Sequence, residues 1–194
     1  PNLYILNGNM QREQAELFAP EDIEQLLWTA SQAFDISIVD VSAYWDNAAT
    51  IITGIRAGGK YLVTVPQIDC FQDDFRAWIC NTAPLFGISP RQFSLIVTQI
   101  GKLTDEYRES EVFHSTGLPL VAAISHEEDL IGCMQQGQLA EWIKSRKTVH
   151  RGLGDIAAKM AATAGIIWTP PPEPRLLAKF RLRTSRRQAG VDLR

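Results

Sequence analysis

One acidic residue, Asp40, stands at the end of an apolar run, where a carboxylate could act on a metal-bound water. The preceding residues 36–39 are largely apolar and predict a buried strand. In open α/β sheets, ligands bind beyond the carboxyl ends of the strands. A carboxylate at that position accepts a hydrogen bond from a water molecule bound to Mg²⁺. A strand-end Asp that caps a turn is the alternative interpretation of Asp40.

Polar side chains also follow two other apolar runs of the sequence. Thr98 and Gln99 close one run, and Ser125 and His126 follow another. We expect these residues at the same edge of the sheet as Asp40, because the carboxyl ends of parallel strands meet there. A catalytic His needs a nucleophile within reach, and the sequence shows none, which favours a surface position for His126.

Aromatic residues flank the Asp40 segment and lie on the predicted helices. Tyr44 and Trp45 come soon after Asp40 and could either stack on a base or cover the end of the sheet. Trp28 and Trp78 fall on apolar helix faces. That position predicts that both tryptophans belong to the core.

A glycine-rich stretch, residues 54–61, nearly spells the phosphate-binding pattern G-x-x-x-x-G-K-[ST]. The working motif joins a strand to a following helix, so that the helix N-terminus cradles phosphate. Here the order is reversed, because a predicted helix ends at the glycines and Lys60 opens a strand. Tyr61 also replaces the metal-binding hydroxyl. The stretch is therefore not a phosphate loop, and no other stretch of the sequence is a candidate.

Hydrophobic patterning places these residues on alternating strands and helices. Five apolar runs predict buried strands: Leu3–Leu6, Ile36–Val41, Lys60–Val65, Phe93–Thr98 and Pro119–Ile124. Between them, amphipathic patterns predict helices from Pro20 and within 48–58, 71–79, 104–114, 125–137 and 153–165. Strands that are apolar throughout and alternate with such helices indicate a mainly parallel sheet covered on both faces. We therefore expect an α/β, doubly wound domain over residues 1–168, followed by a Pro-rich linker and basic tail over 169–194.

Charge is distributed unevenly along the 194 residues, whose net charge is −3. Residues 1–172 hold 12 Lys and Arg against 20 Asp and Glu, whereas 173–194 hold 7 basic and 2 acidic residues. An acidic body argues against binding to duplex DNA, which requires clustered cations. No apolar run reaches the length of a membrane span. Three cysteines without metal-ligand spacing are typical of reduced thiols in a cytoplasmic protein.

The order of these motifs resembles the MinD/ParA family of deviant-Walker ATPases, including the pilus-assembly relatives CpaE and TadZ. Residues Phe34–Trp45, a helix and then Lys60–Pro66 resemble the family's Walker B strand, switch II loop and following strand. Gly117–Ile124 with Ser125–Asp129 resembles a later strand and loop, and Leu130–Gly137 resembles the helix after it. The resemblance covers about residues 1–164.

The resemblance implies a P-loop NTPase fold of the SIMIBI type that binds ATP and Mg²⁺. It gives Asp40 the role of polarising Mg²⁺-bound water, and it places Thr98, Gln99 and Ser125 on the nucleotide-binding side. In the family, ATP is sandwiched between two subunits, so a homodimer is implied. Members position cellular assemblies such as division, partition or pilus machinery, so a protein partner of such a system is expected.

The chain also departs from the family pattern. Its phosphate loop and switch I would precede residue 1, on a strand that is normally central in the sheet. Thr98 and Gln99 stand where an Asn and its neighbour are expected, and Ser125 replaces a Pro. We expect these residues alone not to hydrolyse ATP. Three alternatives stay open: the carboxyl-terminal portion of a longer ATPase, a non-catalytic pseudo-ATPase scaffold, or an unrelated small-molecule enzyme with the same sheet topology.

The basic tail, Arg175–Arg187, carries six Lys and Arg among apolar residues. As a helix it would place Leu176, Leu177 and Phe180 on one face, which resembles the membrane-targeting helix of MinD. Such a segment would bind anionic lipid at the inner face of the membrane. Lys179–Arg183 instead alternates as a strand would. A solvated tail of a cytoplasmic protein is the third interpretation.

Overall fold

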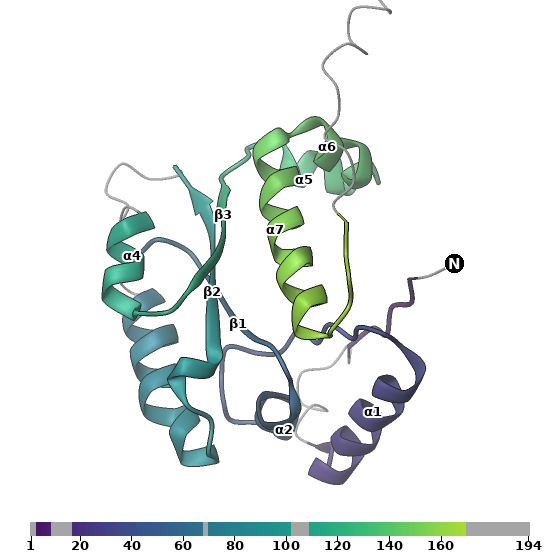
Figure 1. Cartoon of the computed structure of the whole chain (residues 1–194), viewed down its shortest axis with the longest axis vertical. Coiled ribbons are helices and arrows are strands. Elements are labelled where there is room, and N and C mark those ends of the chain that lie inside the picture. Colours follow the sequence, from purple (N-terminus) through teal and green to yellow (C-terminus); the bar gives the residue numbers. More distant parts are fainter. Residues whose placement is uncertain (1–2, 9–16, 68–69, 102–108, 170–194) are drawn as a thin grey trace, which may run out of the picture.

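A parallel sheet forms the centre of the molecule. The computed structural model describes residues 3–8, 17–67, 70–101 and 109–169. Within these residues lie three strands, β1 (Lys60–Thr64), β2 (Phe93–Ile100) and β3 (Leu120–Ser125), in the order β1-β2-β3. All pairs are parallel, and helices flank the sheet on both sides (Figure 1). The chain therefore belongs to the α/β class, as the alternating pattern predicts.

Helices connect and cover these strands. In chain order they are α1 (Pro20–Ala33), α2 (Ala48–Arg56), the π-type helix η2 (Phe71–Thr82), the short 3₁₀ helices η3 (Ala83–Phe86) and η4 (Pro90–Gln92), α4 (Glu109–Thr116), α5 (Leu130–Gln135), α6 (Leu139–Ser145) and α7 (Lys147–Thr163). Figure 1 shows α7 on one side of the sheet and α4 on the other. Asn47 begins α2 by accepting a hydrogen bond from the Thr50 backbone N–H at 2.9 Å.

The central strand β2 is the most deeply buried element. Leu95 and Val97 are fully buried, and Ile96 between them is almost so. Because successive side chains point to opposite faces, β2 is covered on both faces, which explains the consecutive apolar residues Leu95–Val97 at its centre. The side of Leu95 and Val97 packs against Phe75 and Ile79 of η2.

The helix α7 approaches the sheet closely on the opposite side. A Cβ atom added at Gly152 would lie 3.1 Å from Cγ1 of Ile124 in β3. The missing side chain at Gly152 therefore lets the helix pack directly on the strand. This contact, together with η2 on the other side, holds the sheet between two helical layers (Figure 1).

Two of the five predicted strands are not strands in the structure. Leu3–Leu6 and Ile36–Val41 belong to no helix or strand, and their side chains are exposed. An apolar run becomes a strand only when another strand pairs with its backbone. Among the described residues, no strand pairs with either run. The other three predicted strands are confirmed as β1, β2 and β3, and each of their ends agrees within two residues: Lys60–Val65, Phe93–Thr98 and Pro119–Ile124.

The start of one predicted helix and the burial of one tryptophan also need correction. The pattern 125–137 predicts a helix from Ser125, but α5 begins at Leu130. The reason is that Ser125 still belongs to β3 and the His126 N–H donates to the Ile100 carbonyl at 2.9 Å, which extends the sheet pairing. Trp28 is 65% exposed on α1, so its prediction as core is wrong.

Part of the sequence lies outside the described residues. The first residues of the predicted helix 104–114 are among them, and so is the whole tail Arg175–Arg187, for which the membrane and strand interpretations stay predictions. Among the helices that the structure does describe, none combines the length and the hydrophobicity that a membrane crossing requires.

Leu95 should be the most sensitive position of the sheet. Leu95→Ala removes a fully buried side chain, and we expect the free energy of unfolding to fall by about 2–5 kcal/mol. Leu85→Ala, at a side chain that is 80% exposed, should change it by less than about 0.5 kcal/mol. Urea unfolding followed by circular dichroism measures both. Equal effects would contradict the assignment of β2 as the core.

Candidate functional site

A cavity of about 650 Å³ lies beside the edge strand β1. One wall consists of the consecutive residues 35–43, and the other consists of 57–63, which include most of β1. Trp78 and Ile79 of η2 line it from one helical layer, and Met160 and Thr163 of α7 line it from the other. This cavity is the candidate site because it contains Asp40, the residue that the sequence singles out.

Asp40 is exposed and lines the cavity. None of the ion pairs in the described part of the chain involves it. No group of three or more His, Cys, Asp or Glu that could hold a metal occurs among the described residues. Asp40 therefore belongs to no such group, although Asp35 lines the same cavity, and it suits hydrogen bonding to a metal-bound water better than direct ligation. These residues alone do not form a complete Mg²⁺·ATP site.

Thr50 lines the cavity wall but keeps its hydroxyl buried. It lies in the first turn of α2 and is only 2% exposed, and its Oγ1 has no hydrogen-bond partner. A buried hydroxyl without a partner is unfavourable by about 1–3 kcal/mol. Thr50 therefore marks a local cost in the packing of α2.

Lys60 confirms that the glycine-rich stretch 54–61 is not a phosphate loop. Helix α2 ends at Arg56 and β1 begins at Lys60, so the order is helix then strand. The Lys60 Nζ donates to the carbonyl of Ala57, the C-cap of α2, at 2.7 Å. Burial lowers the pKa of Lys60. The Lys60 ammonium group thus caps the carboxyl end of α2.

The structure brings Thr98, Gln99 and Ser125 together but leaves them outside the Asp40 cavity. All three lie at the carboxyl ends of β2 and β3, where Ile100 pairs with Ser125. The Thr98 hydroxyl donates to the Thr64 carbonyl at 3.3 Å, and Gln99 has a φ of 59° where the register between β2 and β3 shifts. None of the three lines the cavity.

Tyr44 and Trp45 both pack against other aromatic rings of the chain. The Tyr44 ring meets Trp78 edge-on, with ring centroids 5.7 Å apart. Trp45 stacks on Phe86 at 6.2 Å and also contacts Phe93. These contacts favour the packing interpretation of both aromatic residues over base stacking.

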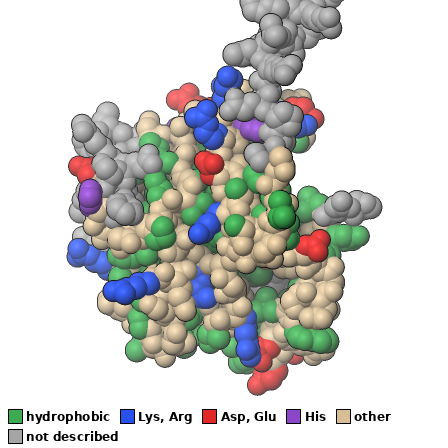
Figure 2. Space-filling model, viewed as in Figure 1, with side chains coloured by type: hydrophobic (Ala, Val, Ile, Leu, Met, Phe, Trp, Pro, Cys, Tyr) green, Lys and Arg blue, Asp and Glu red, His purple; other side chains and the backbone are tan. Residues whose placement is uncertain are grey.

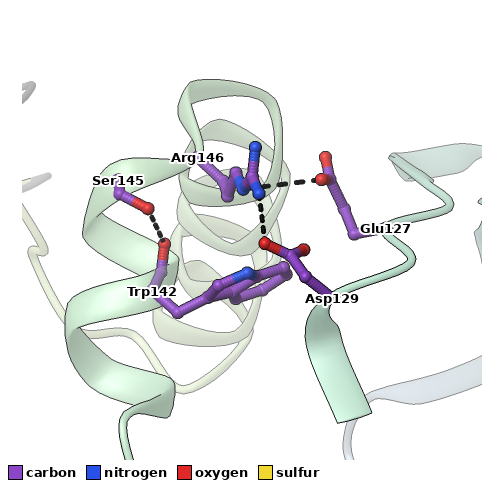
Figure 3. A network of polar contacts seen from close by, with 5 residues as sticks. All are labelled: Glu127, Asp129, Trp142, Ser145 and Arg146. Atoms are coloured by element: carbon purple, nitrogen blue, oxygen red, sulfur yellow. Dashed lines mark hydrogen bonds and ion pairs between the residues drawn. The ribbon is translucent and has the colours of Figure 1, made fainter. Parts of the chain in front are cut away.

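A charged network for which the sequence carries no local signal lies beyond β3 (Figure 3). Arg146, between α6 and α7, donates to the Asp129 carboxylate and lies 3.6 Å from Glu127 Oε2 through its Nε. Its guanidinium lies 5.9 Å from the ring centre of Trp142. The network joins the loop after β3 to the α6–α7 corner. Arg146 lies 17 and 19 residues from the two carboxylates along the sequence, so no local pattern could reveal it.

The Asp129 carboxylate titrates abnormally in this network. Its pKa is lowered by the nearby Trp142 indole N–H and by Arg146. That N–H forms no hydrogen bond of normal geometry, so it acts on Asp129 through its dipole at close range (Figure 3). None of these residues lines the cavity beside β1, and the network is best understood as a clamp between two segments.

Comparisons with known proteins add no relative. Neither a protein-family model, nor a curated protein, nor a solved structure matches this chain.

The clamp predicts a defined pH dependence. Because the pKa of folded Asp129 is lowered, its contribution to stability is present above its unfolded pKa of about 3.9 and is lost as the pH falls through the folded value. We expect Asp129→Asn to lower the urea midpoint at pH 7 and the difference from the parent chain to shrink towards pH 3. Asp155→Asn, at an exposed carboxylate outside the network, is the matched control. A difference that is the same at both pH values would contradict the clamp.

Proposed function

We propose that these 194 residues are part of a MinD/ParA-like ATPase that dimerises with ATP and positions a cellular assembly such as division, partition or pilus machinery. The observation that carries this function is the position of Asp40. It ends an apolar segment and lines a cavity beside a parallel sheet with helices on both sides. In a SIMIBI-type, doubly wound sheet, this carboxylate would hold the water that binds Mg²⁺.

The other parts of such a site would come from elsewhere. A phosphate loop, which binds the charges of ATP with backbone N–H groups and a Lys, is not among the described residues. The proposed ATPase therefore requires that residues beyond these 194 supply it. ATP and Mg²⁺ would then bind between two subunits of a homodimer. The tail Arg175–Arg187 would add a contact with anionic lipid at the inner face of the membrane.

A non-catalytic scaffold with the same fold is the second candidate. The observation that favours it concerns the residues expected to bind the nucleotide. The Thr98 hydroxyl is used within the sheet, and Gln99 and Ser125 point to no cavity shared with Asp40. A relative that keeps the fold for binding a protein partner has no need of these side chains.

Asp40→Asn in the native polypeptide, as isolated from its source cells, separates the two candidates. If the chain is part of an ATPase, we expect Mg²⁺-dependent ATP turnover to fall by at least about 100-fold, because the charge that polarises the bound water is lost. Asp155→Asn, at an exposed carboxylate that does not line the cavity, should leave turnover within about twofold.

The intact mass of that polypeptide is the companion measurement. The ATPase requires a mass above 21.7 kDa by about 10 kDa or more, enough for a further strand and phosphate loop. Absence of ATP turnover in both variants and in the parent polypeptide would leave the non-catalytic scaffold as the remaining candidate function. Full turnover in Asp40→Asn would overturn the role of Asp40.

A further inference from the structure

The cavity runs along the edge of β1 and along residues 35–43, which belong to no strand, instead of lying over the face of a sheet. Side chains alternate along an extended segment, so a cavity above one face touches only every second residue. Here the cavity touches every residue from 35 to 43 and every residue from 57 to 63. Both walls therefore turn their backbones towards it, and the cavity lies in the plane of the sheet.

The β1 wall is an unprotected sheet edge. In the three-stranded sheet, β1 pairs with β2 alone, so its outer side has no strand partner among the described residues. Val63 on this strand is 59% exposed. Natural proteins normally protect such an edge with charges, Pro or a bulge. Among the five residues of β1, only Lys60 is charged.

The opposite wall is an apolar segment that lacks the burial its composition requires. Ile38 is 73% exposed, and Ile36, Val39 and Val41 are also exposed. A connection of about 20 residues that contains α2 joins this segment to β1, which is the usual length of a crossover between parallel strands. Segment and strand are thus connected like members of one sheet, with a space between them.

The space extends from one helical layer to the other. Trp78 and Ile79 of η2 face it on one side, and Met160 and Thr163 of α7 face it on the other. A strand placed there would bury alternate side chains against the two layers.

We propose that this space receives an apolar β-strand of about five residues from a polypeptide segment other than these 194 residues. Its backbone would pair with β1 on one side and with 36–41 on the other. It would be uncharged throughout, because a charge buried between two apolar layers is strongly disfavoured. We call this space the strand slot, bounded by residues 35–43 and 57–63.

The chain's own other segments do not supply such a strand. Residues 9–16, 102–108 and 170–194 contain no stretch of five uncharged residues. The uncharged, exposed run Leu3–Leu6 does not line the cavity, and its Tyr4 packs on Phe34 instead, with ring centroids 5.4 Å apart. The strand slot does not depend on the proposed ATPase, since any strand of this composition would satisfy it. The result of a peptide-binding test is therefore independent of the result of the ATP-turnover test.

The probe is a synthetic peptide in which Val-Ile-Val-Ala-Val is flanked by paired lysines, labelled for fluorescence anisotropy. We expect saturable binding to the 194-residue chain and quenching or shifting of tryptophan fluorescence, because Trp45 and Trp78 both line the slot. Replacing the central Val by Pro removes a backbone donor, and this control peptide should bind at least about tenfold more weakly.

Two variants locate the binding. Ile38→Asp and Val63→Asp place a charge on either wall at exposed side chains, so each should weaken peptide binding at least about tenfold with little effect on the fold. Ile167→Asp, at a side chain that is 99% exposed and outside the slot, should stay within about twofold.

Three results would overturn the strand slot. The first is equal binding of the Val and Pro peptides, which would indicate unspecific hydrophobic contact. The second is unchanged binding in Ile38→Asp and Val63→Asp. The third is a stable dimer of the free chain, measured by sedimentation, that Ile38→Asp dissociates, since the occupant would then be a second copy of the chain. Circular dichroism of each variant confirms that it is folded.

Discussion

A β-strand presents backbone hydrogen-bonding groups along both of its edges, and β1 pairs with a strand on one edge alone among the described residues. Strand β2, by contrast, has a partner on each side and a helical layer over each face, and its side chains are the most completely buried. The difference between these two neighbours explains the location of the cavity. It lies where pairing stops, and its second wall is an apolar segment that nothing else covers.

Most of the exposed large hydrophobic side chains precede β1 in the sequence. They include Leu3–Leu6, the segment 36–41 and Trp28 of α1, while Leu85, Ile131 and Ile167 are exposed after β1. Figure 2 shows hydrophobic side chains at the surface around the N-terminal segment and α1. Elements that follow β1 are instead joined by the core of η2 and β2 and by the Arg146 clamp. The well-packed half of the molecule is therefore the half whose sheet is paired.

The sequence allowed the paired half to be predicted well, because its signals are local. Residues 93–98 are largely apolar, and such a run predicts a strand buried on both faces. The run 36–41 is also largely apolar, although it includes Ser37 and Asp40. Whether that run becomes a strand depends on a partner that no local pattern reveals. Trp28 was assigned to the core for the same reason: an amphipathic pattern predicts an apolar face without showing what covers it.

The candidate site was predicted only in part, and its parts differ in kind. Asp40 follows an apolar run, which is a local signal, and the structure places it in a cavity. Thr98, Gln99 and Ser125 were identified through the resemblance, and they meet at the ends of β2 and β3, outside that cavity. No sequence pattern identified Thr50, because the missing hydrogen-bond partner of its hydroxyl depends on the surroundings of α2 in the fold. The Arg146 clamp joins residues far apart in sequence, which only the fold brings together.

Hydrogen–deuterium exchange of the free chain tests the open sheet edge most directly. If the sheet ends at β1, amides of residues 36–41 should exchange at close to the unprotected rate, whereas those of β2 should be slowed by at least about 100-fold. Protection of 36–41 equal to that of β2 in the monomeric chain would show that this segment is already paired. That result would contradict both the open edge and the slot beside it.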